Sequence, residues 1–101
     1  MNVQIQATKI ELTEAIKGYV QEKMDMLEKY LGDVQVLNCD AEIGVSVGGQ
    51  HHGDIFFCEI NLNVPHSLIR VRKEENDLYK AIDKVKDHLE RSIVKYKEKR
   101  K

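Results

Sequence analysis

The sequence predicts an α+β domain with the element order β-α-β-β-β-α, in which a four-stranded sheet carries two helices packed on one face. Two observations predict this class. Four segments alternate apolar and polar residues with the period of a half-buried strand, and two longer segments repeat apolar residues at helical spacing. A chain of 101 residues suffices for one hydrophobic core, so residues 1–101 are expected to form a single domain.

The first two elements are a strand and a long helix. The strand is predicted over residues 2–8, where apolar and polar side chains alternate. A helix of about five turns is then expected, because apolar residues recur at helical spacing from Ile16 until Gly32 ends the pattern. Thr13 offers a hydroxyl group as the N-cap of this helix.

Three further strands are predicted over residues 40–47, 56–64 and 68–73, with a hairpin loop at 48–53 and a turn that begins at Pro65. Consecutive strands joined by short turns form an antiparallel meander. The pattern leaves open whether the first strand pairs with this meander in parallel. The sheet face opposite the helices is expected to carry Gln4, Gln6, Glu42, Glu59, Arg70 and Arg72.

The last helix has the clearest pattern in the chain. Asn76 or Asp77 can cap its start, and the apolar residues that follow step by four or three positions and share one stripe. These residues are Leu78, Ile82, Val85, Leu89, Ile93 and Tyr96. The end of the chain, residues 97–101, is expected to fray.

No motif in the chain indicates catalysis. No Ser, Cys or Lys lies in a recognisable nucleophile motif, and no glycine-rich phosphate loop follows a predicted strand and opens a helix. The adjacent carboxylates Glu74 and Glu75 lie where a strand leads into a helix, and negative charge favours a helix N-terminus. We therefore expect a protein that is not an enzyme and needs no cofactor.

Metal binding and a disulfide framework are not indicated either. Cys39 and Cys58 are 19 residues apart with no Cys-x-x-Cys pair, so both are expected to be reduced thiols. His51 and His52 lie in the hairpin loop, and a tight metal site needs three or four converging ligands, so an exposed polar turn is the favoured interpretation. Two isolated histidines are expected on the surface: His66 and His88.

The chain has no expected membrane segment. No apolar run approaches the roughly 18 residues of a membrane span. Residues 1–4 lack the basic and then apolar pattern of a signal peptide. We expect a cytoplasmic protein with no membrane partner.

Charge is strongly segregated along the chain, although the formal net charge is only -1 at pH 7. Residues 1–83 carry eight Lys/Arg and 14 Asp/Glu, a net of -6. Residues 84–101 carry eight Lys/Arg and three Asp/Glu, a net of +5. A charged partner is therefore expected to interact mainly with the C-terminal stretch.

Cations gather on one side of the last helix, opposite its apolar stripe. Four of them fall within about 60° of one another, interrupted only by Asp87. They are Lys80, Lys84, Arg91 and Lys95. One interpretation is a solvated outer face, because most charge runs only solubilise. The outward Arg70 and Arg72 and the acidic remainder favour another, in which the cations bind a phosphate backbone and displace its counterions.

The cations alone do not distinguish RNA from DNA or from an acidic protein. Aromatic residues do not resolve the question, because the tyrosines fall on or beside apolar stripes and are expected in the core rather than stacked on bases. These residues are Tyr19, Tyr30, Tyr79 and Tyr96.

Four strings of residues, taken with the order of the elements, are similar to those of a known family. The strings are Ile10-Glu11-Leu12-Thr13-Glu14-Ala15-Ile16, Lys23 followed by Leu27-Glu28-Lys29-Tyr30-Leu31, Cys58-Glu59-Ile60-Asn61-Leu62, and Asp77-Leu78-Tyr79-Lys80-Ala81-Ile82-Asp83. The last is followed by Leu89, Arg91, Lys95 and Lys97 at the family's spacing. The chain thus resembles, over nearly its whole length, the ribosome hibernation-promoting factors, also described as ribosome-associated inhibitor or sigma-54 modulation proteins.

The resemblance implies a domain similar in architecture to double-stranded RNA-binding domains. It implies binding to the small ribosomal subunit through 16S rRNA, in the channel for messenger RNA and the A- and P-site transfer RNAs, which silences translation in starved or stationary cells. Its partners would be single 70S or dimeric ribosomes and not DNA, and it would be a monomer in solution. The family's RNA-contacting positions correspond to Lys23, Lys29, Lys84, Arg91, Lys95 and Lys97. The argument from the basic surface adds Lys80, Arg70 and Arg72.

Two features depart from the family pattern or qualify it. His88 and Ser92 occupy positions where family members often have Lys and Gln, which lowers the positive charge of this face by one at neutral pH. The chain ends at Lys101, so it resembles the short type without the domain that dimerises ribosomes, and whether it pairs ribosomes or inactivates single ones stays open. The alternative function is a protein-interaction module that binds an acidic partner or self-associates through the exposed sheet face.

Overall fold

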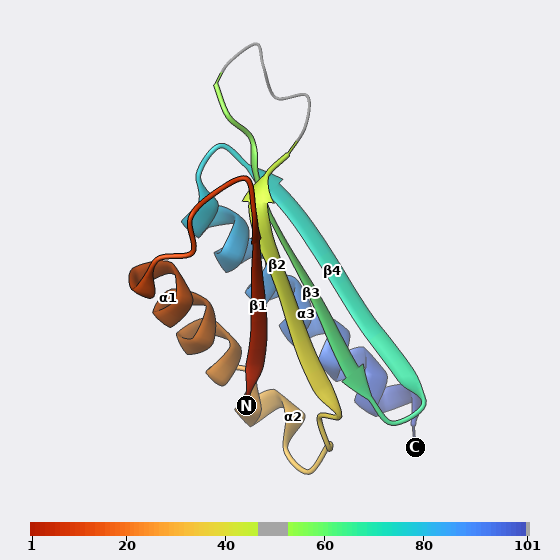
Figure 1. Ribbon diagram of the computed structural model, residues 1–101. Helices are drawn as coiled ribbons and strands as arrows, with labels where there is room; N and C mark the ends of the chain where they lie inside the picture. Colours follow the sequence, from red (N-terminus) through yellow and green to blue (C-terminus); the bar gives the residue numbers. More distant parts are fainter. Residues whose placement is uncertain (47–52, 101) are drawn as a thin grey trace.

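The computed structural model describes residues 1–46 and 53–100, and it confirms the predicted α+β class (Figure 1). The predicted hairpin loop, including His51 and His52, lies outside the described residues apart from Gly53. One sheet has the strand order β1-β2-β3-β4. Its strands are β1 (Val3–Thr8), β2 (Asn38–Val45), β3 (Phe56–Val64) and β4 (Ser67–Glu75), and the helices are α1 (Glu14–Asp25), α2 (Glu28–Leu31) and α3 (Leu78–Lys99).

The strand pairing resolves the question that the sequence left open. β1 pairs in parallel with β2, with Ile5 opposite Ala41, while β2, β3 and β4 form the predicted antiparallel meander. Parallel neighbours need a crossover connection, which the segment containing α1 and α2 supplies. β1 and β4 are therefore the two edge strands of the sheet.

The helix predicted before Gly32 is divided into two. α1 ends at Asp25 and α2 begins at Glu28, because the amide of Leu27 bonds the carbonyl of Met24, three residues back, at 3.0 Å. This tighter turn interrupts the regular helix and leaves Leu27 fully buried. Thr13 caps α1 as predicted, since its hydroxyl accepts from the amide of Ile16 at 3.2 Å. Gly32, with φ of 58°, follows α2.

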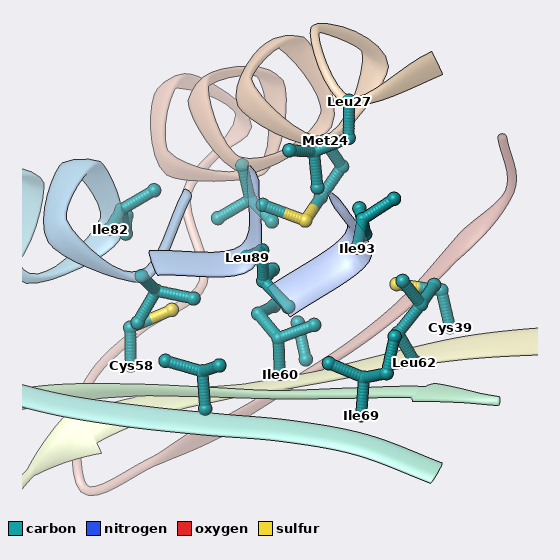
Figure 2. Close-up of a cluster of buried hydrophobic side chains, with 14 of the residues drawn as sticks. Met24, Leu27, Cys39, Cys58, Ile60, Leu62, Ile69, Ile82, Leu89 and Ile93 are labelled. Atoms are coloured by element: carbon teal, nitrogen blue, oxygen red, sulfur yellow. The ribbon is translucent and has the colours of Figure 1, made fainter. Parts of the chain in front are cut away.

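All three helices lie on one face of the sheet, and the core fills the space between the layers (Figure 1). Figure 2 shows Met24 and Leu27 above Leu89 and Ile93 of α3, which in turn face Ile60 of the sheet. The predicted apolar stripe of α3 is confirmed, because Ile82, Val85, Leu89 and Ile93 are fully buried. In the described ranges, no polar or charged residue is buried.

The other sheet face is uncovered in this chain and carries the polar residues that alternation predicts. Glu59 of β3 lies opposite Arg72 of β4, and Gln6 of β1 lies opposite Glu42 of β2. Phe57 shares this face with Glu59, yet only 4% of it is exposed. The guanidinium of Arg72 covers the Phe57 ring at 4.1 Å from its centroid, which shields an aromatic ring that alternation alone places toward solvent.

The C-terminal helix is longer than its predicted apolar pattern. Its N-cap is Asp77, whose carboxylate accepts from the amide of Tyr79 at 2.8 Å. Residues 97–99 continue α3 where a frayed tail was expected, and the Lys97 ammonium donates to the Tyr30 carbonyl at 3.1 Å, which holds this end in place. Lys101 is outside the described part of the chain. None of the helices described is long and apolar enough to cross a membrane.

Candidate nucleic-acid interface

The outward side of α3 carries an exposed row of cations. The helix buries one stripe against the sheet, so the side chains on the opposite side point away from the core. We call the following exposed residues the α3 cationic face: Lys80, Lys84, Arg91 and Lys95. Their positions agree with the sequence prediction that these four cations share a surface.

The cations of this face differ in how much of their charge is compensated. The Lys84 ammonium lies 2.6 Å from a carboxylate oxygen of Glu75, so this cation is paired. An Arg91 guanidinium nitrogen lies 3.4 Å from the backbone carbonyl of Asp87, a weak contact with a neutral group. Within residues 1–46 and 53–100, Lys80, Arg91 and Lys95 form no ion pair. These three side chains are the ones whose charge is most available to an anion.

Two half-buried residues adjoin this face: Lys73, which the sequence analysis did not single out, and His88, which the family resemblance places on it. Lys73 lies on the edge strand β4, and His88, expected as an isolated surface histidine, lies on α3 with part of its ring covered. Burial lowers the pKa of His88, and the positive charges of Lys73, Arg91 and Lys95 lower it further, so the imidazole is neutral at pH 7. The alternation of β4 places Lys73 on the helix side of the sheet, and this signal could have identified it.

The lysines predicted on the first helix occupy different environments. The Lys23 ammonium lies 3.4 Å from an Asp83 carboxylate oxygen and 5.2 Å from the Tyr19 ring centroid, so it joins α1 to α3. Lys29 is exposed, with its ammonium 5.3 Å from the Tyr30 ring centroid. Lys29 is therefore free to contact an external anion, whereas Lys23 would first have to leave a carboxylate.

The predicted strand arginines lie mostly apart from the α3 cationic face. Arg72 lies 3.7 Å from Glu59 and 3.4 Å from Glu74, and it covers Phe57 on the uncovered sheet face. Arg70 donates from Nε to the Asn61 side-chain oxygen at 2.6 Å. Alternation predicts both arginines on the sheet face opposite the helices, and Arg72 lies there beside Glu59 and Phe57, on the other side of the sheet from α3.

Neither cysteine thiol is exposed for reaction at the surface. Cys39 and Cys58 are free and buried in the core. Burial raises the pKa of Cys39 to about 11 and that of Cys58 to about 12, so both are protonated at neutral pH. In the part of the chain that the structure describes, no group of three or more His, Cys, Asp or Glu residues could hold a metal ion.

One tyrosine departs from its expected core position. Tyr79 is 39% exposed at the start of α3, while the other three tyrosines are half-buried. The Tyr19 and Tyr79 rings meet edge to face with centroids 4.7 Å apart, and the Tyr19 hydroxyl donates to Asp83 at 2.6 Å. These contacts join α1 to α3 and fix the direction of the helix that carries the cations.

The fold and the α3 cationic face together define a class: a small α+β domain that presents a row of positive charge on one helix. Residues 3–101 match the sequence model of the family described as Sigma 54 modulation protein / S30EA ribosomal protein. The chain belongs to this family.

Similar proteins include ribosome hibernation promotion factors from several bacteria. The protein of Deinococcus radiodurans is 34% identical over 95 residues, which are 93% of this chain and 48% of that protein. That of Staphylococcus aureus (strain COL) is 31% identical over 94 residues, which are 93% of this chain and 47% of that protein. The chain spans about half the length of the curated relatives it matches.

Solved structures share the same architecture. The crystal structure of the Thermus thermophilus Protein Y N-terminal domain is 32% identical, with a TM-score of 0.76 over 95% of this chain and 99% of that one. A ribosomal subunit interface protein from Coxiella burnetii is 20% identical, with a TM-score of 0.80 over 96% of this chain and 98% of that one. The Coxiella likeness shows the fold alone.

Proposed function

We propose that this chain is a ribosome hibernation factor that occupies the mRNA and tRNA channel of the small subunit and inhibits translation in stationary phase or stress. It acts by binding 16S rRNA as a non-enzymatic plug in the cytoplasm, as a monomer, on 70S or dimeric ribosomes. The observation that carries the proposal is the α3 cationic face, where Lys80, Arg91 and Lys95 stand without a carboxylate partner among the described residues.

Family membership and the physics of RNA support the same assignment. Relatives over this region are named ribosome hibernation promotion factors. Ribosomal RNA presents rigid rows of phosphates that a protein can recognise by shape and charge, without contacts to base edges. The remaining proposed contacts are the first-helix cations Lys23 and Lys29 and, at the end of α3, Lys97. Lys97 and Lys23 would exchange contacts within the protein for phosphates.

The proposal is tested by sedimentation of a stationary-phase lysate through sucrose gradients. The protein should travel with 30S, 70S or heavier particles at low salt and leave them as the salt concentration rises, because each phosphate contact releases counterions. Footprinting should show protection of 16S nucleotides around the decoding centre. Retention in the soluble top fractions at low salt would contradict the proposal and favour a protein-interaction module.

A charge-reversal variant locates the contact on α3. Arg91→Glu with Lys95→Glu should abolish co-sedimentation and leave folding intact, because both side chains are exposed and face away from the core. The matched control is Lys9→Glu with Lys17→Glu, which changes the net charge equally at exposed positions away from this face. If the two double variants lose the ribosome equally, the effect comes from net charge and the assignment to α3 is wrong.

A further inference from the structure

A groove of about 830 Å³ lies where the end of α3 meets the start of the edge strand β4. Figure 1 shows the C-terminal end of α3 beside the turn between β3 and β4. The volume of the groove falls within the range of about 300–1,000 Å³ that is typical of small-ligand sites. Neither the family match nor the sequence analysis assigns a role to this groove.

The groove combines apolar surface with concentrated positive charge. Leu68, Ile69 and Tyr96 line it, and Leu68 is 47% exposed, so the groove offers apolar surface to a ligand. Its cations are Arg70, Lys95, Lys99 and Arg100. None of the described residues that line the groove is Asp or Glu.

Three of these cations are available to a ligand. The Arg100 guanidinium is paired with the Asp33 carboxylate at 2.8 Å. Arg70 is held only by the neutral side chain of Asn61, and Lys95 and Lys99 form no ion pair within the described ranges. The groove therefore favours an anion that also has an apolar surface.

The two walls are fixed to each other. The Tyr96 hydroxyl donates to the Pro65 carbonyl at 2.8 Å, and it ties the last turns of α3 to the turn before β4. Tyr96 also packs against the hydrophobic core. The groove is thus present before a ligand arrives, which reduces the entropy cost of binding.

We propose that this groove binds one unpaired nucleotide of RNA, with its base against Leu68 and Tyr96 and its flanking phosphates against Arg70, Lys95 and Lys99. The inference rests on the proposed function and names the kind of RNA that the site takes. Every base has an apolar face, and single-stranded RNA is bound by such faces combined with cations along the backbone.

The row of cations on α3 favours RNA over an acidic peptide. Arg91, Lys95 and Lys99 are spaced by four residues, so they recur about every 6 Å along the helix. A regular row of this kind matches the regular charge of a phosphate backbone. Lys95 belongs both to the groove and to the α3 cationic face, so a strand that leaves the groove meets Arg91 next.

The test compares two fluorescently labelled probes by anisotropy. One is a hexamer of adenosine ribonucleotides, and the other has the same six-residue backbone with its two central bases removed, so the phosphate charge is identical. The wild-type protein should bind the complete hexamer more tightly by on the order of 5- to 100-fold, the range expected for one or two stacked bases. Leu68→Ala should lower this ratio, because it removes one of the two surfaces that contact the base, and should leave the salt dependence of binding unchanged.

Two further variants make the result specific. Val94→Ala is the matched control, because Val94 is 44% exposed on α3 outside the groove, and it should keep the wild-type ratio. Lys99→Gln should weaken both probes by a similar factor, since it removes a phosphate contact. Circular dichroism melting of each variant checks that the fold is intact.

Several outcomes would overturn the inference. They are equal binding of the two probes by the wild-type protein, an unchanged ratio in Leu68→Ala, or tighter binding of a polyglutamate peptide than of the complete hexamer. Failure to bind either probe would overturn it as well. If the protein still sediments with ribosomes in any of these cases, only the groove assignment fails, whereas loss of sedimentation refutes the proposed function.

Discussion

Gly44 shows how one residue fixes the pairing of the first two strands. A Cβ atom at this position would overlap the carbonyl oxygen of Thr8 and would lie 3.0 Å from the Phe57 ring. Thr8 and Gly44 are direct partners in the parallel β1–β2 pair. Only a residue without a side chain lets the two backbones and the Phe57 ring occupy this part of the sheet.

We predict that Gly44→Ala destabilises the protein by about 2–4 kcal/mol, because the methyl group must displace backbone rather than a flexible side chain. Gly18→Ala is the matched control: a Cβ there meets nothing within 4 Å, and Ala is the better helix former. That substitution should stabilise the protein by about 0.5–1 kcal/mol. Urea unfolding of both variants measures the difference, and equal effects would show that the β1–β2 contact tolerates a side chain.

Burial and, to a lesser extent, three neighbouring cations lower the pKa of His88. Within the described residues its Nδ1 atom is buried without a hydrogen-bond partner, and Lys73 faces it from β4 while Arg91 and Lys95 lie on its own helix. The lowered pKa means that the unfolded chain binds a proton at this site more readily than the folded one. The contribution of neutral His88 to the free energy of unfolding is therefore fully present above the unfolded pKa of about 6.5, and it is lost as the pH falls below that value.

We predict that the free energy of unfolding decreases as the pH falls from 7 toward 5, with a slope from His88 of at most about 1.4 kcal/mol per pH unit. His88→Gln should flatten this decrease because it removes the group that titrates. Lys73→Gln should raise the pKa of His88 because it removes one repelling charge. NMR titration of the imidazole provides the direct measurement, and a pKa at or above 6.5 in the folded wild-type protein would contradict the prediction.

At the scale of elements, α3 depends on a side-chain cap as well as on its apolar stripe. The carboxylate of Asp77 accepts from the Tyr79 amide and places negative charge at the helix N-terminus. Asp77→Ala should cost about 0.5–2 kcal/mol, whereas Asp77→Asn should retain most of the stability because Asn caps about as well. Thermal unfolding of the two variants checks this, and an equal loss in both would point to charge rather than to the hydrogen bond.

The elements also show what could be predicted from the sequence. The strands, the stripe of α3, the Thr13 cap and the α3 cationic face follow from periodicity and capping, which are local properties. The division between α1 and α2 does not, because it depends on burying Leu27 in the finished core. Burial of Phe57 also depends on a tertiary contact, because the guanidinium that covers its ring belongs to Arg72 of the neighbouring strand.

The candidate interface also combines residues that the sequence predicts with residues that only the tertiary structure places there. The outward positions of Lys80, Arg91 and Lys95 follow from helical geometry alone. The alternation of β4 could also have placed Lys73 on the helix side of the sheet, whereas the groove beside Leu68 requires knowing that α3 ends against the edge strand β4, which is a tertiary relation. Whether these residues touch RNA stays a prediction that the binding experiments address.

For the whole molecule, the proposed binding surface and the core are separate. The α3 cationic face points away from the sheet, while the opposite stripe of the same helix packs on β3 and β4. Charge on the outer side can therefore vary without changing the packed layer. This separation makes Arg91 and Lys95 suitable sites for changing binding without changing the fold.

The two core thiols provide a test of that separation over the whole molecule. Cys39 is 1% exposed and Cys58 is fully buried, and their raised pKa values leave almost no thiolate in the folded state. We predict that a thiol reagent at pH 8 labels both only when the core opens, at equal rates in Cys39→Ala and Cys58→Ala variants of matched stability. Faster labelling of one thiol in native protein would show that part of the sheet opens alone.

Arg91→Glu with Lys95→Glu should leave the labelling rate within about twofold of wild type, because neither side chain packs in the core. If the rate rises in step with the loss of ribosome binding, then binding was lost through unfolding rather than through the removal of positive charge.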